Sequence, residues 1–246
     1  MKPGMMRAWL RLFAVQAAWN FERLQGIGAA WASEPLLRDL PGGPGGERYR
    51  DAMRRAANFF NAHPYFAGLA VGAIARAEHD GVPASQIERL RSTLPAPLGS
   101  VGDRLIWAGV LPTTSGLGLA LAATMPWALG PAVFVVLYNV VHLMVRGWAL
   151  RAGWENGMHV SRALAEPWLQ TALRLAVPFS LASVGFALPV MGSWLTDGLT
   201  WSGRGGVLAV AVLGVALGRW VLPTLSGLRF GLSAAGLALV VGWLWQ

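Results

Sequence analysis

The chain has 246 residues, of which 54% are hydrophobic and only 13% carry a charge. Soluble domains carry about 25% charged residues, so this composition excludes an ordinary soluble globule. The net charge of +8 does not come from a basic cluster on a polar scaffold, so it excludes a nucleic-acid binder and instead suits a lipid bilayer with anionic headgroups.

Cysteine is absent, which excludes disulfides, thiolate catalysis and cysteine-based zinc sites. The four histidines have no metal-ligand spacing: they are His63, His79, His142 and His159. No nucleophile–base pair or metal cluster typical of an enzyme is visible in the sequence. We therefore expect no catalytic residue, no bound metal and no cofactor.

The first predicted element covers residues 5–32, which are apolar but contain several polar side chains: Arg11, Asn20, Glu22 and Arg23. Lys2, Arg7 and Arg11 also interrupt the hydrophobic run that a secretory signal would need, so we expect no such signal. Polar atoms at membrane depth need partners, so these residues predict an amphipathic or re-entrant helix that packs against protein.

Two further features follow before the long apolar segments. The sequence PGGPGG at 41–46 is typical of a flexible connector. Residues 47–60 place four arginines opposite apolar side chains, which predicts a basic amphipathic helix. Pro64 is expected to kink or end that helix.

The decisive segment runs from 105 to 145 and contains no charged residue. One membrane-spanning helix needs about 20 apolar residues, so this segment predicts two spans, with a turn at 125–131. Further apolar segments predict two or three more spans: 175–196, 205–222 and 230–246. The fold class is therefore an all-α polytopic membrane protein, in which N-terminal amphipathic or re-entrant helices precede four or five transmembrane helices.

The charged residues divide the chain into two expected parts. Residues 1–104 hold 22 of the 32 charges and form an amphipathic and re-entrant module, whereas 105–246 form the transmembrane module. Several tryptophans lie near the ends of the predicted spans, as interfacial residues do: Trp107, Trp127, Trp148, Trp194, Trp220, Trp243 and Trp245. The positive-inside rule places both the N-terminus and the arginine-rich connection that begins at Arg146 in the cytoplasm.

Three polar motifs lie in the first module, at 19–23, 59–65 and 98–103. Each combines hydrogen-bonding side chains with aromatic residues or glycines, a mixture that suits a sugar. The candidate substrate-path residues are Trp19, Asn20, Glu22, Asn61, His63 and Asp103. The alternative is that the same polar groups only satisfy helix ends, with Asp103 as the N-cap of a helix that starts at Leu105.

Three segments resemble hallmark segments of the IID component of mannose/fructose/sorbose-family phosphotransferase systems: AWNFERLQ at 18–25, FFNAHPY at 59–65 and PLGSVGD at 97–103. The order and spacing of these segments match as well. The resemblance continues through IWAG at 106–109 and the 139–146 segment, and covers roughly residues 6–160.

The resemblance implies a non-catalytic, multi-pass subunit of the inner (plasma) membrane that works with a IIC partner. Together they would carry a hexose inward, while IIA and IIB proteins deliver phosphate through phosphohistidines. It also implies a trimer of IIC–IID pairs and no phosphorylation site in this chain. His63 is then expected to form hydrogen bonds near the sugar path or to fix the 61–64 turn.

Two departures from the family pattern keep an alternative open. The 39–50 stretch carries PGGPGG in place of a plain helical hairpin, and the C-terminal half is short and poor in arginine. Such a chain could be a diverged IID-like regulatory or assembly subunit that transports no sugar. An unrelated membrane enzyme or channel is the third hypothesis.

Overall fold

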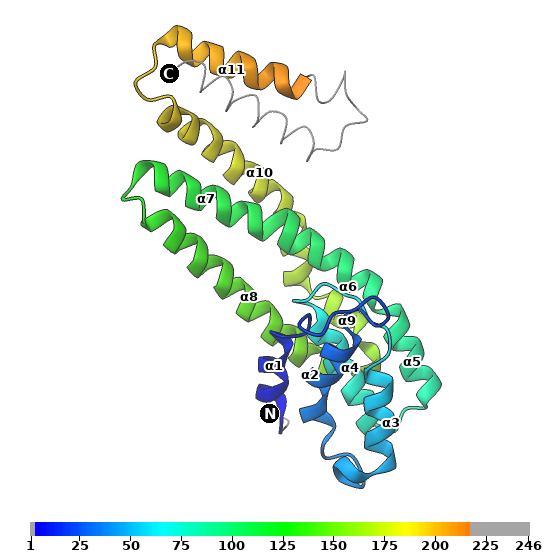
Figure 1. Cartoon of the computed structure of the whole chain (residues 1–246). Helices are drawn as coiled ribbons and strands as arrows, with labels where there is room; N and C mark the ends of the chain where they lie inside the picture. The colour runs from blue at the N-terminus through cyan, green and yellow to red at the C-terminus, as the bar shows by residue number, and fades with distance from the viewer. Residues whose placement is uncertain (1–2, 217–246) are drawn as a thin grey trace. The chain divides into compact units, whose positions relative to one another are not determined.

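The computed structural model describes residues 3–216, and every regular element in this range is helical (Figure 1). The all-α prediction is therefore confirmed. In chain order the elements are α1 (Met5–Leu12), α2 (Gly26–Leu37), the 3-10 turn η1 (Gly43–Gly45), α3 (Glu47–Ala56), α4 (Ala67–His79), α5 (Ala84–Thr93), α6 (Pro95–Gly102), the π-helix η2 (Asp103–Val110), α7 (Leu111–Thr124), α8 (Leu129–Asn156), the 3-10 turn η3 (Gly157–His159), α9 (Ser161–Leu164), α10 (Pro167–Leu195) and α11 (Trp201–Ala216).

Three helical stretches of the described residues are long and apolar enough to cross a membrane: Ala84–Thr124, Leu129–His159 and Pro167–Leu195. The predicted turn at 125–131 is confirmed, because α7 ends at Thr124 and α8 begins at Leu129. The predicted span at 205–222 begins within α11, and the rest of it, together with 230–246, lies outside the described residues. The total of four or five spans therefore stays a prediction.

The single helix predicted for residues 5–32 is wrong. Helix α1 ends at Leu12, and irregular turns follow until α2 begins at Gly26. After Leu12 the backbone bonds run from residue i to i−3, as from the Val15 N–H to the Leu12 carbonyl (3.2 Å). Further on, the Asn20 side-chain oxygen accepts from the backbone N–H of Glu22 (3.1 Å) and of Arg23 (2.9 Å). This Asx turn competes with the helix for the backbone.

Two charged residues of α1 and α2, Arg11 and Glu34, are paired with each other, as burial in a membrane protein requires. Arg11 donates to a Glu34 carboxylate oxygen at 2.7 Å, and Arg38 also bonds to Glu34. Burial raises the pKa of Glu34, but the bonds from Arg38 and Arg11 outweigh it, so the net pKa is lowered. The expectation of protein partners for these polar groups is confirmed for Arg11.

The basic helix predicted over 47–60 is shorter than expected. Helix α3 ends at Ala56, so Pro64 does not end it. Residues 57–66, which we call the strap, leave the helix because the Phe60 N–H donates to the Arg23 carbonyl (3.2 Å) and the Phe60 carbonyl accepts from the Gln25 N–H (2.8 Å). Pairing with the distant 23–25 segment therefore replaces the last helical turn.

The assignment of Asp103 as an N-cap is also wrong. The helix starts earlier, with Pro95 in its first turn, so Asp103 lies within a helical run rather than at its start. Residues 103–110 form a π-helix and make no side-chain cap hydrogen bond. Short π-helical bulges are frequent at functional sites in proteins.

Helix α4 is buried along almost its whole length and packs along α8 and against α2, within the cluster of short helices in Figure 1. Glycines permit the close approach: a Cβ on Gly72 would lie 2.4 Å from the Leu150 carbonyl oxygen, and one on Gly153 would lie 2.3 Å from that of Leu69. Small residues at helix crossings allow such backbone contact.

The chain divides into two compact units, Met1–Met191 and Gly192–Gln246. The first contains α1 to α9 and most of α10, and the described part of the second is residues 192–216. The division at 104/105 expected from the charge distribution stays a prediction.

Candidate functional site

An open cleft of about 1160 Å³ lies where the strap, α6, η2 and α8 meet. We call it the polar cleft, and it is lined by Gln16, Gln25, Asn61, Ala62, His63, Pro64, Tyr65, Pro95, Ala96, Gly99, Ser100, Asp103, Arg104, Trp107, Ala108, His142 and Arg146. Its lining combines amides, a carboxylate, two guanidinium groups and aromatic rings, so both hydrogen-bond donors and acceptors face one space.

Gln25 holds the strap in place. Its side chain is buried and brackets one residue: the Gln25 Nε2 donates to the Ala62 carbonyl (2.8 Å), and its Oε1 accepts from the Ala62 N–H (3.2 Å). With the backbone bonds at Phe60, these contacts fix the strap on both sides of Asn61. The neighbouring Asn61 and His63 therefore reach the cleft from a fixed backbone.

His63 is only 3% exposed and forms part of the cleft wall. Gly102 makes room for it, because a Cβ at that position would lie 2.2 Å from the His63 Cβ and Cγ. The imidazole also packs against Tyr65 and Trp107, with ring centroids 5.1 and 5.4 Å away. The glycine of the PLGSVGD motif and the histidine of the FFNAHPY motif are thus two halves of one contact.

The protonation of His63 follows from its surroundings. Burial lowers the pKa of His63 to about 4, with Asp103 opposing the shift and Arg146 adding to it, so the ring is neutral at physiological pH. The Tyr65 N–H donates to Nδ1 at 3.3 Å, so Nε2 carries the proton. That N–H has no acceptor in the described part of the chain.

The far side of the polar cleft is built around Arg146, which is 5% exposed. Its Nε donates to His142 Nε2 at 2.6 Å, and its terminal nitrogen donates to the Leu12 carbonyl of α1. The guanidinium lies over the rings of Phe13 (4.9 Å) and Tyr65 (5.0 Å). Among the described residues, no carboxylate lies within ion-pair distance of Arg146, so aromatic faces and a carbonyl surround this cation.

Tyr65 connects the strap to α8. Its ring stacks on His142 with centroids 4.1 Å apart, and its hydroxyl is 2.7 Å from that of Tyr138. Burial and the Tyr138 hydrogen bond raise the pKa of Tyr65, so its hydroxyl stays protonated. Residues from α1, the strap and α8 therefore form one connected polar network along the cleft wall.

The structure brings together three of the six predicted site residues. Asn61, His63 and Asp103 line the polar cleft. Trp19 and Glu22 are exposed outside that lining, and Asn20 makes the local turn described above. A substrate role for any of the six stays a prediction.

The sequence profile of the family described as "PTS system mannose/fructose/sorbose family IID component" matches residues 2–193. The chain belongs to this IID family. All residues that line the polar cleft fall within the matched range. The family resemblance recognised in the three motifs is confirmed.

Characterised relatives agree with this assignment. The IID chain is 30% identical to the mannose-specific EIID component of Escherichia coli K12 over 167 residues, which are 66% of this chain and 58% of that protein. It is 28% identical to the fructose permease IID component of Bacillus subtilis, over 79% of this chain and 70% of that one. The match thus spans less than two thirds of the Escherichia coli relative's length.

Solved structures share the fold. One described as a membrane protein matches 74% of the IID chain and 68% of its own, with a TM-score of 0.66 and 28% identity. A complex of the mannose transporter ManYZ with microcin E492 matches 80% of this chain and 70% of its own, with a TM-score of 0.59 and 27% identity. The prediction of a membrane protein is confirmed by these neighbours together with the three candidate spans.

Sequence reasoning did not select several cleft residues of the IID chain: Gln25, Tyr65, Trp107, His142 and Arg146. For His142 and Arg146 a signal was available. They lie four residues apart, on one helix face, at the end of an otherwise uncharged 41-residue run. Ionisable residues in such a run are functional candidates by default. Gln25 lies inside a recognised motif, but its partner is 37 residues away.

Proposed function

We propose that this IID chain is a non-catalytic subunit of a sugar phosphotransferase system of the inner membrane. With a IIC partner it forms the translocation unit for a hexose of the mannose, fructose or sorbose class, while IIA and IIB proteins deliver the phosphate. The match of the IID family over residues 2–193 carries this proposal. Relatives named for mannose and fructose, and a ManYZ transporter with the same fold, support it.

The polar cleft is the part of the chain that we assign to the sugar path. A hexose needs hydrogen-bond partners for its hydroxyls and an aromatic face for its C–H surface. Asn61 and Asp103 supply the first, and Trp107 supplies the second. The neutral His63 packs tightly against Gly102, and this contact positions the part of the cleft wall that carries Asn61, Asp103 and Trp107.

The test is hexose uptake by cells that lack their own hexose phosphotransferase subunits and receive this chain with its IIC, IIA and IIB partners. We expect phosphorylated hexose to accumulate only when this chain is present. If the membrane complex forms but no hexose of the three classes enters, the chain is a regulatory or assembly subunit and the transport proposal is wrong.

Asn61→Ala tests the cleft within the same assay. Loss of one hydrogen bond to the sugar is expected to lower uptake by roughly tenfold, while co-purification with the IIC partner stays unchanged. Glu22→Gln is the control variant. We expect it to keep wild-type uptake, because Glu22 is exposed outside the cleft lining. Normal uptake by Asn61→Ala would remove Asn61 from the sugar path, and loss of the complex would make its role structural.

A further inference from the structure

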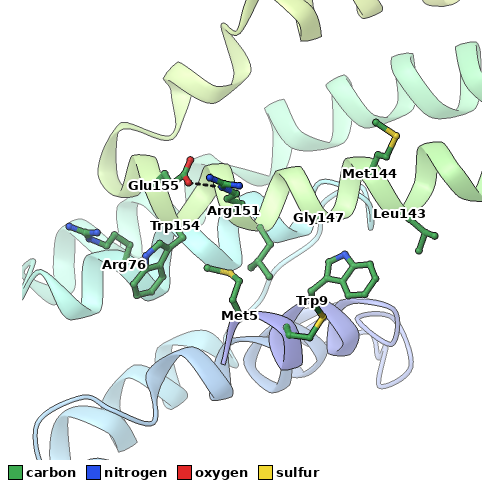
Figure 2. Close-up of a pocket in the computed structure, with 11 residues that line it drawn as sticks. Met5, Trp9, Arg76, Leu143, Met144, Gly147, Arg151, Trp154 and Glu155 are labelled. Carbon is green, nitrogen blue, oxygen red and sulfur yellow. Dashed lines mark hydrogen bonds and ion pairs between the residues drawn. The ribbon is translucent and has the colours of Figure 1, made fainter. Parts of the chain in front are cut away.

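A second groove lies between α1, α4 and α8, away from the polar cleft, and has a volume of about 850 Å³ (Figure 2). Leu143 and Met144 make one end apolar along α8, and Met6 of α1 also lines the groove; all three side chains are exposed. The other end carries Arg151 and Glu155, whose side chains form an ion pair at 2.7 Å. The groove thus changes from apolar to charged along α8.

The position of this change along α8 matches the edge of a membrane. A hydrocarbon core about 30 Å thick needs roughly 20 helical residues, and the first 17 residues of α8, 129–145, are uncharged. Met144 therefore lies within the apolar stretch, and Arg151 lies about 10 Å beyond it at 1.5 Å per residue. The groove crosses from acyl-chain depth to headgroup depth.

Two features of the groove favour a ligand that carries both charged groups and carbonyl oxygens. The Arg151–Glu155 pair is exposed and offers one cation and one carboxylate side by side. The Trp9 indole, which faces α8 in Figure 2, has no acceptor for its N–H in the described part of the chain. Ester carbonyls of glycerophospholipids lie at this depth of a bilayer.

We infer that this groove binds a glycerophospholipid whose headgroup carries both a phosphate and a primary ammonium. One acyl chain lies against Met6, Leu143 and Met144, and the phosphate pairs with Arg151 while the ammonium pairs with Glu155. Arg76 of α4 also lines the groove, but its charge is taken by Asp80 at 2.9 Å. The charges at the mouth are therefore balanced, and this favours a zwitterionic headgroup over a purely anionic one, because an anion would meet the Glu155 carboxylate without compensation.

Gly147 offers a direct way to block the groove. It lies on the groove lining, and a Cβ there would meet only the Trp9 Nε1, at 3.6 Å, which is an ordinary contact. Gly147→Leu therefore fills the groove from α8. Gly185→Leu in α10 is the matched control, because a Cβ at Gly185 has no neighbour within 4 Å in the described chain.

The experiment is native mass spectrometry of the purified full-length chain, titrated with dioleoyl phosphatidylethanolamine and, separately, with dioleoyl phosphatidylglycerol. We expect the wild type and Gly185→Leu to retain the ethanolamine lipid equally, and Gly147→Leu to lose it. Arg151→Gln changes an exposed side chain, so folding is not at risk, and it is expected to weaken retention by roughly tenfold, as loss of one charge-assisted hydrogen bond would.

Two results would overturn the inference. The first is equal retention by Gly147→Leu and the wild type. The second is equal or tighter binding of phosphatidylglycerol, which would contradict the headgroup assignment. In the first case, loss of IIC co-purification by Gly147→Leu would identify the groove as a protein interface.

Discussion

Gly99 and Gly102 lie three residues apart on α6, yet only Gly99 has room for a side chain. A Cβ at Gly99 has no neighbour within 4 Å, whereas one at Gly102 overlaps the His63 ring. The two glycines of this short motif therefore serve different structural purposes. Gly102 is needed for close packing, and Gly99 leaves the polar cleft open.

Gly102→Ala is expected to displace His63 and to destabilise the fold by about 1–3 kcal/mol, as overpacking does. Gly99→Ala should leave the free energy of unfolding unchanged or raise it by roughly 0.5–1 kcal/mol, because alanine is the better helix former. Thermal unfolding of both variants in the same detergent compares them. Equal melting temperatures for the two variants would contradict the tight contact.

The lowered pKa of His63 predicts that acid destabilises the chain. In the unfolded chain the imidazole has its ordinary pKa of about 6.5, and in the fold burial lowers it to about 4. The unfolded state therefore binds more protons between these values, so stability is complete above about pH 6.5 and falls as pH drops toward 4.

His63→Gln should flatten this part of the pH profile of the melting temperature between pH 7.5 and 4.5. His159 is exposed, so His159→Gln serves as the control and is expected to keep the wild-type slope. A His63→Gln profile as steep as that of the wild type would assign the acid sensitivity to other groups.

At the scale of elements, the contact between α4 and α8 depends on backbone proximity. Gly72 faces the Leu150 carbonyl and the Trp154 N–H of α8 so closely that no side chain fits between them. Helix α4 follows the strap and α8 carries Arg146, so this contact joins the two elements that bear these parts of the cleft wall.

Gly72→Ala should separate α4 from α8 and lower the melting temperature by several degrees, because backbone atoms cannot give way as a flexible side chain can. Gly185→Ala in α10 is the matched helical control, with no neighbour within 4 Å. Limited proteolysis of membrane vesicles provides a second measurement. A Gly72→Ala chain as resistant as the control would show that the crossing tolerates a methyl group.

Some elements were predictable because their signal is local. The turn between α7 and α8 followed from prolines at 126 and 131 within an uncharged run, and it lies where expected. The strap was not predictable, because its pairing with Gln25 spans 37 residues and no local pattern encodes it. Asp103 resembled an N-cap only because the helical run that starts at Pro95 was not recognised.

The same distinction explains the candidate site. Asn61, His63 and Asp103 were selected because each is a polar residue in an aromatic or glycine-rich motif, and they do share one cleft. Trp19, Asn20 and Glu22 have the same local character but belong to an exposed turn. Motif composition therefore identified candidate polar groups, whereas their convergence depends on tertiary contacts.

At the scale of the whole molecule, the family match and the polar cleft both belong to the first compact unit. That unit ends at Met191, and the family match ends at residue 193. Among the described residues, no member of the cleft lining comes from the second unit.

A chain shortened to residues 1–196 is therefore expected to insert into the membrane and to melt within a few degrees of the full chain. The measurements are membrane accumulation and thermal unfolding. The 1–196 chain that also carries Gly72→Ala serves as the destabilised reference. Failure of the shortened chain to accumulate, with the full chain produced normally, would show that the first unit is not self-sufficient.

The hydrogen bond from Arg146 to the Leu12 carbonyl joins residues that are 134 positions apart. At synthesis rates of 5–20 residues per second, roughly 7–27 s separate the emergence of these two residues from the ribosome. Helix α1 is therefore made long before the guanidinium that anchors it exists. During that interval the first helices of the nascent chain lack their final partner, so we expect them to be accessible to quality-control proteases and chaperones.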